Sequence, residues 1–234
     1  MSKRQDIQKI ILPVKTAILI DGAFYRRRAQ IMLGEKSPEE RAEELHNYCL
    51  RHLYTHNELF SLYRIFYYDC PPMEKKLYHP FLKKQIDYSK SEFGVWMKTF
   101  LDELKRRRKF ALRMGQLAED QAHFSIRPDV IKKICNGSKR FDDLTEADFF
   151  LNVTQKGVDM KIGLDIASLA FKKQVEKIVL ISGDSDFVPA AKLARREGID
   201  FVLDPLFNPI KPDLFEHIDG LRTCEGRFRP DNKK

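Results

Sequence analysis

Short apolar runs that stop abruptly at turn residues are the clearest pattern in this sequence. Four runs are rich in β-branched and other apolar residues: residues 16–20, 62–68, 178–181 and 201–203. Each is followed at once by a turn that contains an aspartate, respectively Asp21, Asp69, Asp184 and Asp204. Continuous apolar runs of this length are typical of strands buried on both faces of a sheet. The pattern therefore predicts buried strands whose ends carry acidic side chains.

Amphipathic helical segments alternate with these strands. Ser37 is followed by Pro38 and Glu40, the signature of a capped helix start, and apolar residues then recur at helical spacing. Further helical faces cover residues 162–170 and 187–194, and the second stops at Gly198. Strands that alternate with helices form βαβ units, so the chain is predicted to be an α/β protein with a mainly parallel sheet.

The middle of the chain is less regular. Residues 88–109 are predicted to be helical and residues 110–117 to form another strand, but residues 118–153 have little sustained period. We interpret 118–153 as a partly helical insertion in a single domain that spans residues 1–234. The core of that domain is expected over about 15–117 and 154–206, and residues 227–234 are expected to be a frayed polar tail.

Composition narrows the class of protein. The 234 residues are 43% hydrophobic and 32% charged, as expected for a soluble globular chain. We find no run long enough to span a membrane and no signal peptide, so a cytoplasmic protein is expected. The four cysteines are scattered without metal-ligand spacing, which favours reduced thiols over disulfides or structural zinc. The net charge of +8 favours an anionic partner such as nucleic acid.

Four aspartates are placed where catalytic groups are expected in such a fold. Asp21 and Asp184 directly follow predicted strands, whereas Asp159 and Asp186 precede or begin helices. Taken singly, each is more often a turn or cap residue. Carboxylates gathered at the carboxyl ends of parallel strands need a cation to stay ionised together, and Mg²⁺ or Mn²⁺ prefers such oxygen ligands. The arrangement predicts metal-assisted hydrolysis of phosphodiesters.

Three motifs together resemble the NYN domain of the PIN-like nuclease superfamily, particularly its bacterial branch. They are Ile20-Asp21-Gly22, Gln155-Lys156-Gly157-Val158-Asp159 and Ser182-Gly183-Asp184-Ser185-Asp186-Phe187. The resemblance covers residues 15 to about 206 and is poorest in the insertion. It implies a three-layer α/β/α sandwich and a divalent-metal-dependent endoribonuclease. It also implies that Asp21, Asp159, Asp184 and Asp186 bind Mg²⁺ or Mn²⁺ and that Lys156 contacts a phosphate.

Two positions near these motifs need separate comment. Phe24 stands where many members of the family carry an asparagine, which puts the positioning of water or substrate in doubt but removes no carboxylate. Asp165 matches a recurrent aspartate of the family. Because it follows Asp159 by six residues, or about 240° around a helix, it is expected to be structural rather than a ligand.

Basic residues are candidates for RNA contacts. Two clusters stand out, Arg26-Arg27-Arg28 just after the first aspartate and Arg106-Arg107-Arg108 further on. Such clusters neutralise phosphates with little regard to base sequence. Aromatic residues near them could stack on the bases of single-stranded RNA: Tyr25, Tyr88, Phe93, Trp96 and Phe100. A spacing of four between Trp96 and Phe100 is also typical of a buried helix face.

Two alternative functions were weighed against a ribonuclease. A haloacid-dehalogenase-like phosphatase would carry a second carboxylate two residues after Asp21, where this chain has Ala23. A catalytically weak or inactive RNA-binding module of the same fold is the stronger alternative, because folds outlive their activities. The sequence leaves open a preference for RNA or DNA, the mode of cleavage and the formation of a homo-oligomer.

Overall fold

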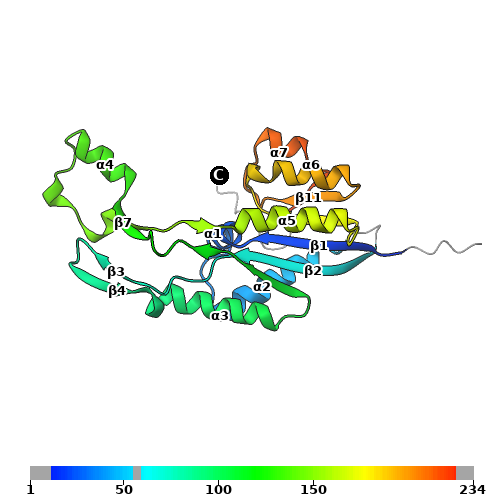
Figure 1. Ribbon diagram of the computed structural model, residues 1–234, viewed down its shortest axis with the longest axis horizontal. Helices are drawn as coiled ribbons and strands as arrows, with labels where there is room; N and C mark the ends of the chain where they lie inside the picture. Colours follow the sequence, from blue (N-terminus) through cyan, green and yellow to red (C-terminus); the bar gives the residue numbers. More distant parts are fainter. Residues whose placement is uncertain (1–11, 55–58, 225–234) are drawn as a thin grey trace, which may run out of the picture.

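The computed structural model describes residues 12–54 and 59–224, and these are built around one parallel sheet of six strands (Figure 1). The strand order is β12-β11-β10-β1-β2-β5. The bounds are β1 Val14–Asp21, β2 Phe60–Asp69, β5 Phe110–Met114, β10 Lys177–Ile181, β11 Asp200–Asp204 and β12 Gly220–Leu221. The four strands predicted from apolar runs are confirmed as β1, β2, β10 and β11.

Helices cover both faces of this sheet and complete three layers (Figure 1). One face carries α5 Val158–Phe171, α6 Val188–Arg196 and α7 Pro212–Glu216. The other carries α1 Gly22–Leu33, α2 Pro38–Arg51 and α3 Glu92–Arg106. The predicted α/β/α sandwich with a parallel central sheet is therefore confirmed.

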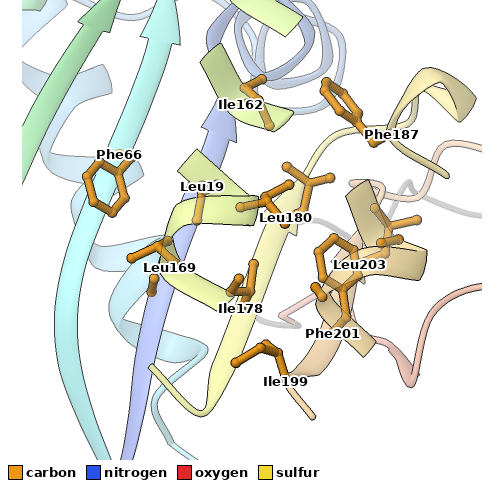
Figure 2. Close-up of a cluster of buried hydrophobic side chains, with 14 of the residues drawn as sticks. Leu19, Phe66, Ile162, Leu169, Ile178, Leu180, Phe187, Ile199, Phe201 and Leu203 are labelled. Atoms are coloured by element: carbon orange, nitrogen blue, oxygen red, sulfur yellow. The ribbon is translucent and has the colours of Figure 1, made fainter. Parts of the chain in front are cut away.

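Alternation along β1 shows why the strand is apolar throughout. Ala17 and Leu19 contribute to the core beneath α5 and α6, whereas Ile18 and Ile20 contribute to the core beneath α1, α2 and α3. All four side chains are fully buried. Figure 2 shows the first of these cores, where Leu19 and other strand residues meet side chains from the helices above them. A sheet covered on both faces needs apolar side chains at successive positions.

Local sequence signals account for the ends of several helices. Ser37 caps α2 by accepting a hydrogen bond from the Glu40 amide, and the Glu40 carboxylate accepts one from the Ser37 amide, so the capping box is confirmed. Gly157 precedes α5 with a φ of 81°, and Gly198 follows α6 with the same φ. Glycine adopts this left-handed conformation without the steric cost that a Cβ imposes.

An arm extends beyond the carboxyl ends of the strands (Figure 1). In this arm a hairpin pairs β3 with β4, a second antiparallel pair joins β7 to β8, and a shorter ladder pairs β6 with β9. The elements of this region are β3 Lys76–His79, β4 Lys84–Asp87, η1 Tyr88–Lys90, β6 Gln116–Leu117, β7 His123–Ile126, α4 Pro128–Cys135, η2 Phe141–Asp143, η3 Glu146–Asp148, β8 Phe149–Asn152 and β9 Gln155–Lys156.

The arm is larger than the insertion expected over 118–153, since the β3–β4 hairpin belongs to it. His79 of β3 contacts Phe124 of β7 and Phe149 of β8, with ring centroids 4.1 and 5.6 Å apart. These contacts join segments far apart in the sequence. Periodicity could not reveal them, because short hairpins carry little pattern of their own.

None of the helices in the described part of the chain is long and apolar enough to cross a membrane. The polar tail predicted over 227–234 lies outside the described residues.

Candidate metal and nuclease site

Asp21 lies where β1 ends and α1 begins. Its Oδ1 accepts a hydrogen bond of 3.0 Å from the amide of Phe24, which makes it the N-cap of α1. The hydroxyl of Ser182, at the end of the neighbouring strand β10, lies 3.3 Å from Asp21 Oδ2 and donates to it. One carboxylate is thus held by two elements and points to the carboxyl edge of the sheet.

The turn after β10 carries the next two acids. Asp184 caps the short helix η4 Ser185–Phe187, because its Oδ1 accepts a hydrogen bond of 3.0 Å from the amide of Asp186. The amide of Asp184 donates to Ser182 Oγ at 3.3 Å, so Ser182 links this turn to Asp21. Both Asp184 and Asp186 are exposed.

Gly183 keeps this turn close to its neighbours. A Cβ at this position would lie 2.9 Å from the ring of Phe24 and 3.2 Å from the amide nitrogen of Asn208. A Cβ at this position would therefore force either the turn or the Phe24 ring to shift.

Asp159 comes from the first turn of α5 and is exposed. A groove of about 450 Å³ between α5 and α6 has both Asp159 and Asp186 among its lining residues. The groove places acids from two different helices on one surface beside the strand ends.

The charges of the four carboxylates affect one another. Partial desolvation of the Asp159 carboxylate raises its pKa above the usual value, and the charges of Asp184 and Asp186 raise it further. Burial also raises the pKa of Asp21, with a further contribution from Asp159, while the Phe24 amide, Arg27 and Ser182 oppose the rise. Like charges that raise one another's pKa form a site that a cation would stabilise.

Missing ion pairs distinguish these acids from other aspartates of the fold. Within the described residues, none of Asp21, Asp159, Asp184 and Asp186 has a basic group within 4.0 Å. By contrast, the strand-end aspartates Asp69 and Asp204 are buried and fully partnered. Asp69 pairs with Arg26 and accepts from Tyr67, and Asp204 accepts from Tyr48, His52 and Thr223.

Asp165 also has partners. Its Oδ2 accepts hydrogen bonds from the Tyr68 hydroxyl at 2.8 Å and from Arg113 Nε at 3.0 Å. These contacts tie α5 to strands β2 and β5, as expected for a structural residue.

A second acidic group lies on α7. Asp213, Glu216 and His217 bring their ligand atoms within 4.8 Å of one another, the one such group of three in residues 12–54 and 59–224. The four aspartates at the strand ends are not drawn together that closely. The α7 group is largely exposed and two of its members, Asp213 and His217, already lie 3.5 Å apart.

The three arginines after Asp21 have different roles. Arg26 is paired with the buried Asp69, and Arg28 donates two hydrogen bonds to the carbonyl of Leu206. Arg27 is exposed and close enough to lower the pKa of Asp21. Of this cluster, Arg27 is the guanidinium available to a phosphate near the acids.

Lys156 and Arg106–Arg108 lie at opposite ends of the sheet. Lys156 is exposed on β9, three residues before Asp159. The tract Arg106, Arg107 and Arg108 lies between α3 and the start of β5, and Phe110 at that start is paired with Ile65 in the middle of β2. This tract is therefore away from the strand ends that carry the acids, and its contact with RNA stays a prediction.

Some of the predicted stacking residues are buried and others are accessible. Tyr25 and Phe100 are fully buried in the core, whereas Phe93 is 60% exposed and Trp96 is half-buried. The sequence expectation that Trp96 and Phe100 pack together is confirmed, since their rings stack with centroids 5.0 Å apart.

Two further side chains at this edge were missed in the sequence. Lys211 Nζ donates a hydrogen bond of 3.0 Å to Ser185 Oγ, which places an exposed cation beside the turn that carries Asp184 and Asp186. Asn208 brings an amide next to Gly183, near the position where Phe24 replaces the expected asparagine. Both come from the loop after β11, which carries no recognisable motif.

Comparison with known proteins bears on the fold and the family. A family model for the NYN domain matches residues 84–208. A crystal structure of a protein of unknown function from Vibrio parahaemolyticus superimposes with a TM-score of 0.50 and 13% identity, over 95% of this chain and 99% of that chain. At that identity the similarity shows the fold alone. The comparison with curated proteins gives no significant match.

Proposed function

Since the chain belongs to the NYN domain family of the PIN-like superfamily, we propose that it is a divalent-metal-dependent ribonuclease that hydrolyses RNA at the carboxyl edge of its sheet. The observation that carries this proposal is the set of four coupled aspartates without ion-pair partners in the described chain. A protein without a cation to bind there would keep this repulsion at a cost in stability.

The donor set fits a hard divalent cation. Asp21, Asp159, Asp184 and Asp186 offer carboxylate oxygens alone, which suit Mg²⁺ or Mn²⁺ better than a softer metal. We propose that these four residues hold the ion. When bound, such an ion neutralises the acids, lowers the pKa of a water and stabilises the charge that develops on a phosphate.

The remaining side chains at this edge position the acids and the substrate. Ser182 orients Asp21 and the Asp184 turn through its hydroxyl. Arg27, Lys156 and Lys211 are exposed cations around the acids and would hold the phosphates of single-stranded RNA. The proposed reaction adds water across a P–O3′ bond. The water oxygen joins phosphorus and the 3′ oxygen leaves with a proton, so that a 5′-phosphate is produced.

The test is cleavage of a labelled single-stranded RNA with Mn²⁺, with Mg²⁺ and with EDTA. We expect the wild type to cut only with metal and Asp184→Asn to lose at least about 100-fold in rate, as when one electrostatic group of an active site is removed. Asp213→Asn is the matched control. It removes an exposed carboxylate of the α7 group and should cut like the wild type.

Two outcomes would count against the proposal. RNA binding without cutting in either metal would support the non-catalytic RNA-binding module instead. Loss of cutting in Asp213→Asn with full activity in Asp184→Asn would move the metal site to α7.

A further inference from the structure

A pocket of about 300 Å³ opens between α1, α2 and α3, on the opposite face of the sheet from the α5–α6 groove. Arg26, Glu35, Glu92, Phe93 and Trp96 are among the residues that line it. Its volume is at the small end of the range for ligand sites. The pocket is not part of the acid cluster described above.

Arg26 connects this pocket to the catalytic edge. Its guanidinium pairs with Asp69 and lies 3.3 Å from the Tyr67 hydroxyl, to which it donates. Asp69 in turn packs against Gly22, the residue after Asp21, since a Cβ on Gly22 would lie 2.5 Å from Asp69 Oδ2. Two side chains, Arg26 and Asp69, therefore link a ligand in the pocket to the chain segment that carries Asp21.

Aromatic side chains form part of the pocket wall. Phe100 stacks on one face of the Trp96 indole, whose Nε1 donates to the Lys36 carbonyl at 3.0 Å, so the ring is held in place. Phe93 is 60% exposed, and the Arg26 guanidinium lies 5.9 Å from its ring centroid. A fixed indole beside an exposed phenyl ring suits a planar, stacking ligand.

The charges of the pocket favour a neutral ligand over a phosphate. Its three basic side chains already have acidic partners: Arg26 pairs with Asp69, and Lys36 and Arg41 both pair with Glu44. Glu35 and Glu92 are exposed, and neither has an ion-pair or hydrogen-bond partner among the described residues. The free charged groups of the pocket are therefore carboxylates, which accept hydrogen bonds.

Building on the proposed ribonuclease function, we infer that this pocket binds a guanine base of the RNA substrate. Guanine offers two adjacent N–H donors, at N1 and N2, which match the two oxygens of one carboxylate. Adenine, cytosine and uracil do not present two adjacent donors on that edge. Glu92 or Glu35 would read the base, while Phe93 and Trp96 would stack on it.

The single tryptophan of the chain makes the test direct. The full-length protein in EDTA is titrated with GMP and, separately, with UMP, while Trp96 fluorescence is recorded and corrected for absorption with free N-acetyltryptophanamide. We expect GMP to change the emission and to bind about tenfold more tightly than UMP, within the discrimination that bidentate base contacts give. Because both nucleotides carry one phosphate, the comparison isolates the base.

Variants assign the effect to the pocket. The double variant Glu35→Gln/Glu92→Gln should abolish the preference for GMP. Phe93→Ala should weaken the binding of both GMP and UMP. Val95→Ala, at an exposed position of α3 outside the pocket, should behave like the wild type. Equal binding of GMP and UMP by the wild type, or a preference that survives in the double glutamine variant, would overturn the inference.

This test separates the pocket from the nuclease. Metal-free nucleotide binding does not require cleavage, so selective GMP binding by a protein that cuts no RNA would retain the pocket and reject the ribonuclease. RNA cutting without selective GMP binding would retain the ribonuclease and reject the guanine pocket. If both the ribonuclease and the guanine pocket are confirmed, guanosine should recur at one fixed position relative to the cut sites in an RNA of mixed sequence.

Discussion

At the scale of single residues, the partners of a carboxylate distinguish its role. Asp69 and Asp204 end strands just as Asp21 does, but both are buried among donors that satisfy them. Asp21 has only neutral donors, and Asp159 has none within the described residues. Carboxylates that lie close together without a cationic partner raise one another's pKa, so a bound cation would stabilise them.

This difference predicts that the two carboxylates make the metal-free protein less stable as pH rises. The pKa values of Asp21 and Asp159 are raised from 3.8, so their contribution to stability is greatest below that pH and is lost as pH rises through the raised values. Asp21→Asn/Asp159→Asn should melt at a higher temperature than the wild type in EDTA at neutral pH. Asparagine also keeps the N-cap of α1.

The measurement is thermal unfolding in EDTA from acidic to neutral pH. The gap between variant and wild type should widen as pH rises, and Mn²⁺ should stabilise only the wild type. A gap that is constant with pH would show that folding does not raise the pKa values of the two carboxylates.

Neighbouring arginines provide a second prediction at this scale. Arg26→Ala leaves the buried Asp69 without its cation, so the free energy of unfolding should fall by about 3 kcal/mol, the lower end of the range for breaking a buried pair. Arg27→Ala should change stability by no more than about 0.5 kcal/mol, since its side chain is exposed.

Denaturant unfolding and RNA binding at several salt concentrations would separate these two roles. Arg27→Ala should weaken RNA binding and reduce the salt slope by about 1, as loss of one phosphate contact does. Equal stability of the two variants would contradict the role of Arg26 in the fold.

At the scale of elements, the strand-to-helix turns position the acids. The β10–η4 turn is held by the Ser182 hydroxyl and by the Asp184 cap, and its backbone passes close to α1. Gly183 is the residue that permits this approach, because Phe24 and Asn208 occupy the space that a Cβ would need. The placement of Asp184 thus depends on a residue with no side chain.

Gly183→Ala should therefore impair function more than folding. The turn must shift by a few tenths of an ångström or more, and small displacements of catalytic groups can cost on the order of 100-fold in rate. We expect a large loss of metal-dependent RNA cleavage with a cooperative melt retained. Gly220→Ala in β12 is the control, since a Cβ there would meet only Val202, at ordinary van der Waals distance.

RNA cleavage rates and thermal unfolding of both variants would show whether Gly183→Ala impairs function more than folding. Full activity in Gly183→Ala would mean that the turn tolerates a Cβ and that Asp184 is not so tightly placed.

At the scale of the whole molecule, the sandwich and the arm depend on different cores. Two large apolar clusters fill the space on either face of the sheet, and Ile162 of α5 is fully buried in one of them (Figure 2). The arm is held by a few ring contacts around His79, Phe124 and Phe149. Small satellite clusters of this kind can open without global unfolding.

Substitutions in the two regions should then have separate effects. Ile162→Ala should lower the free energy of unfolding by about 2–5 kcal/mol, as deletion of a buried side chain does. Phe124→Ala should shift Tm by no more than about 3 °C, equivalent to roughly 1 kcal/mol for a chain of this size.

Limited proteolysis would show where Phe124→Ala acts. New cleavage should fall within residues 76–87 and 118–153 while the sandwich stays intact. Global destabilisation by Phe124→Ala would show that the arm belongs to the main cooperative unit.

Local sequence determined the strands, the capped helices and the candidate acids of this protein. Buried strands must be apolar throughout, Ser37 and Glu40 specify a helix start from within four residues, and Asp21 and Asp184 follow their strands directly. Only the tertiary structure decided which charged side chains have ion-pair or hydrogen-bond partners and which do not. Arg26 and Asp69, Arg28 and Leu206, and Ser185 and Lys211 meet across long separations in the chain, so their pairing depends on strand order and packing rather than on spacing. The same long-range packing formed the arm and the aromatic pocket, because each joins segments whose individual patterns do not refer to one another.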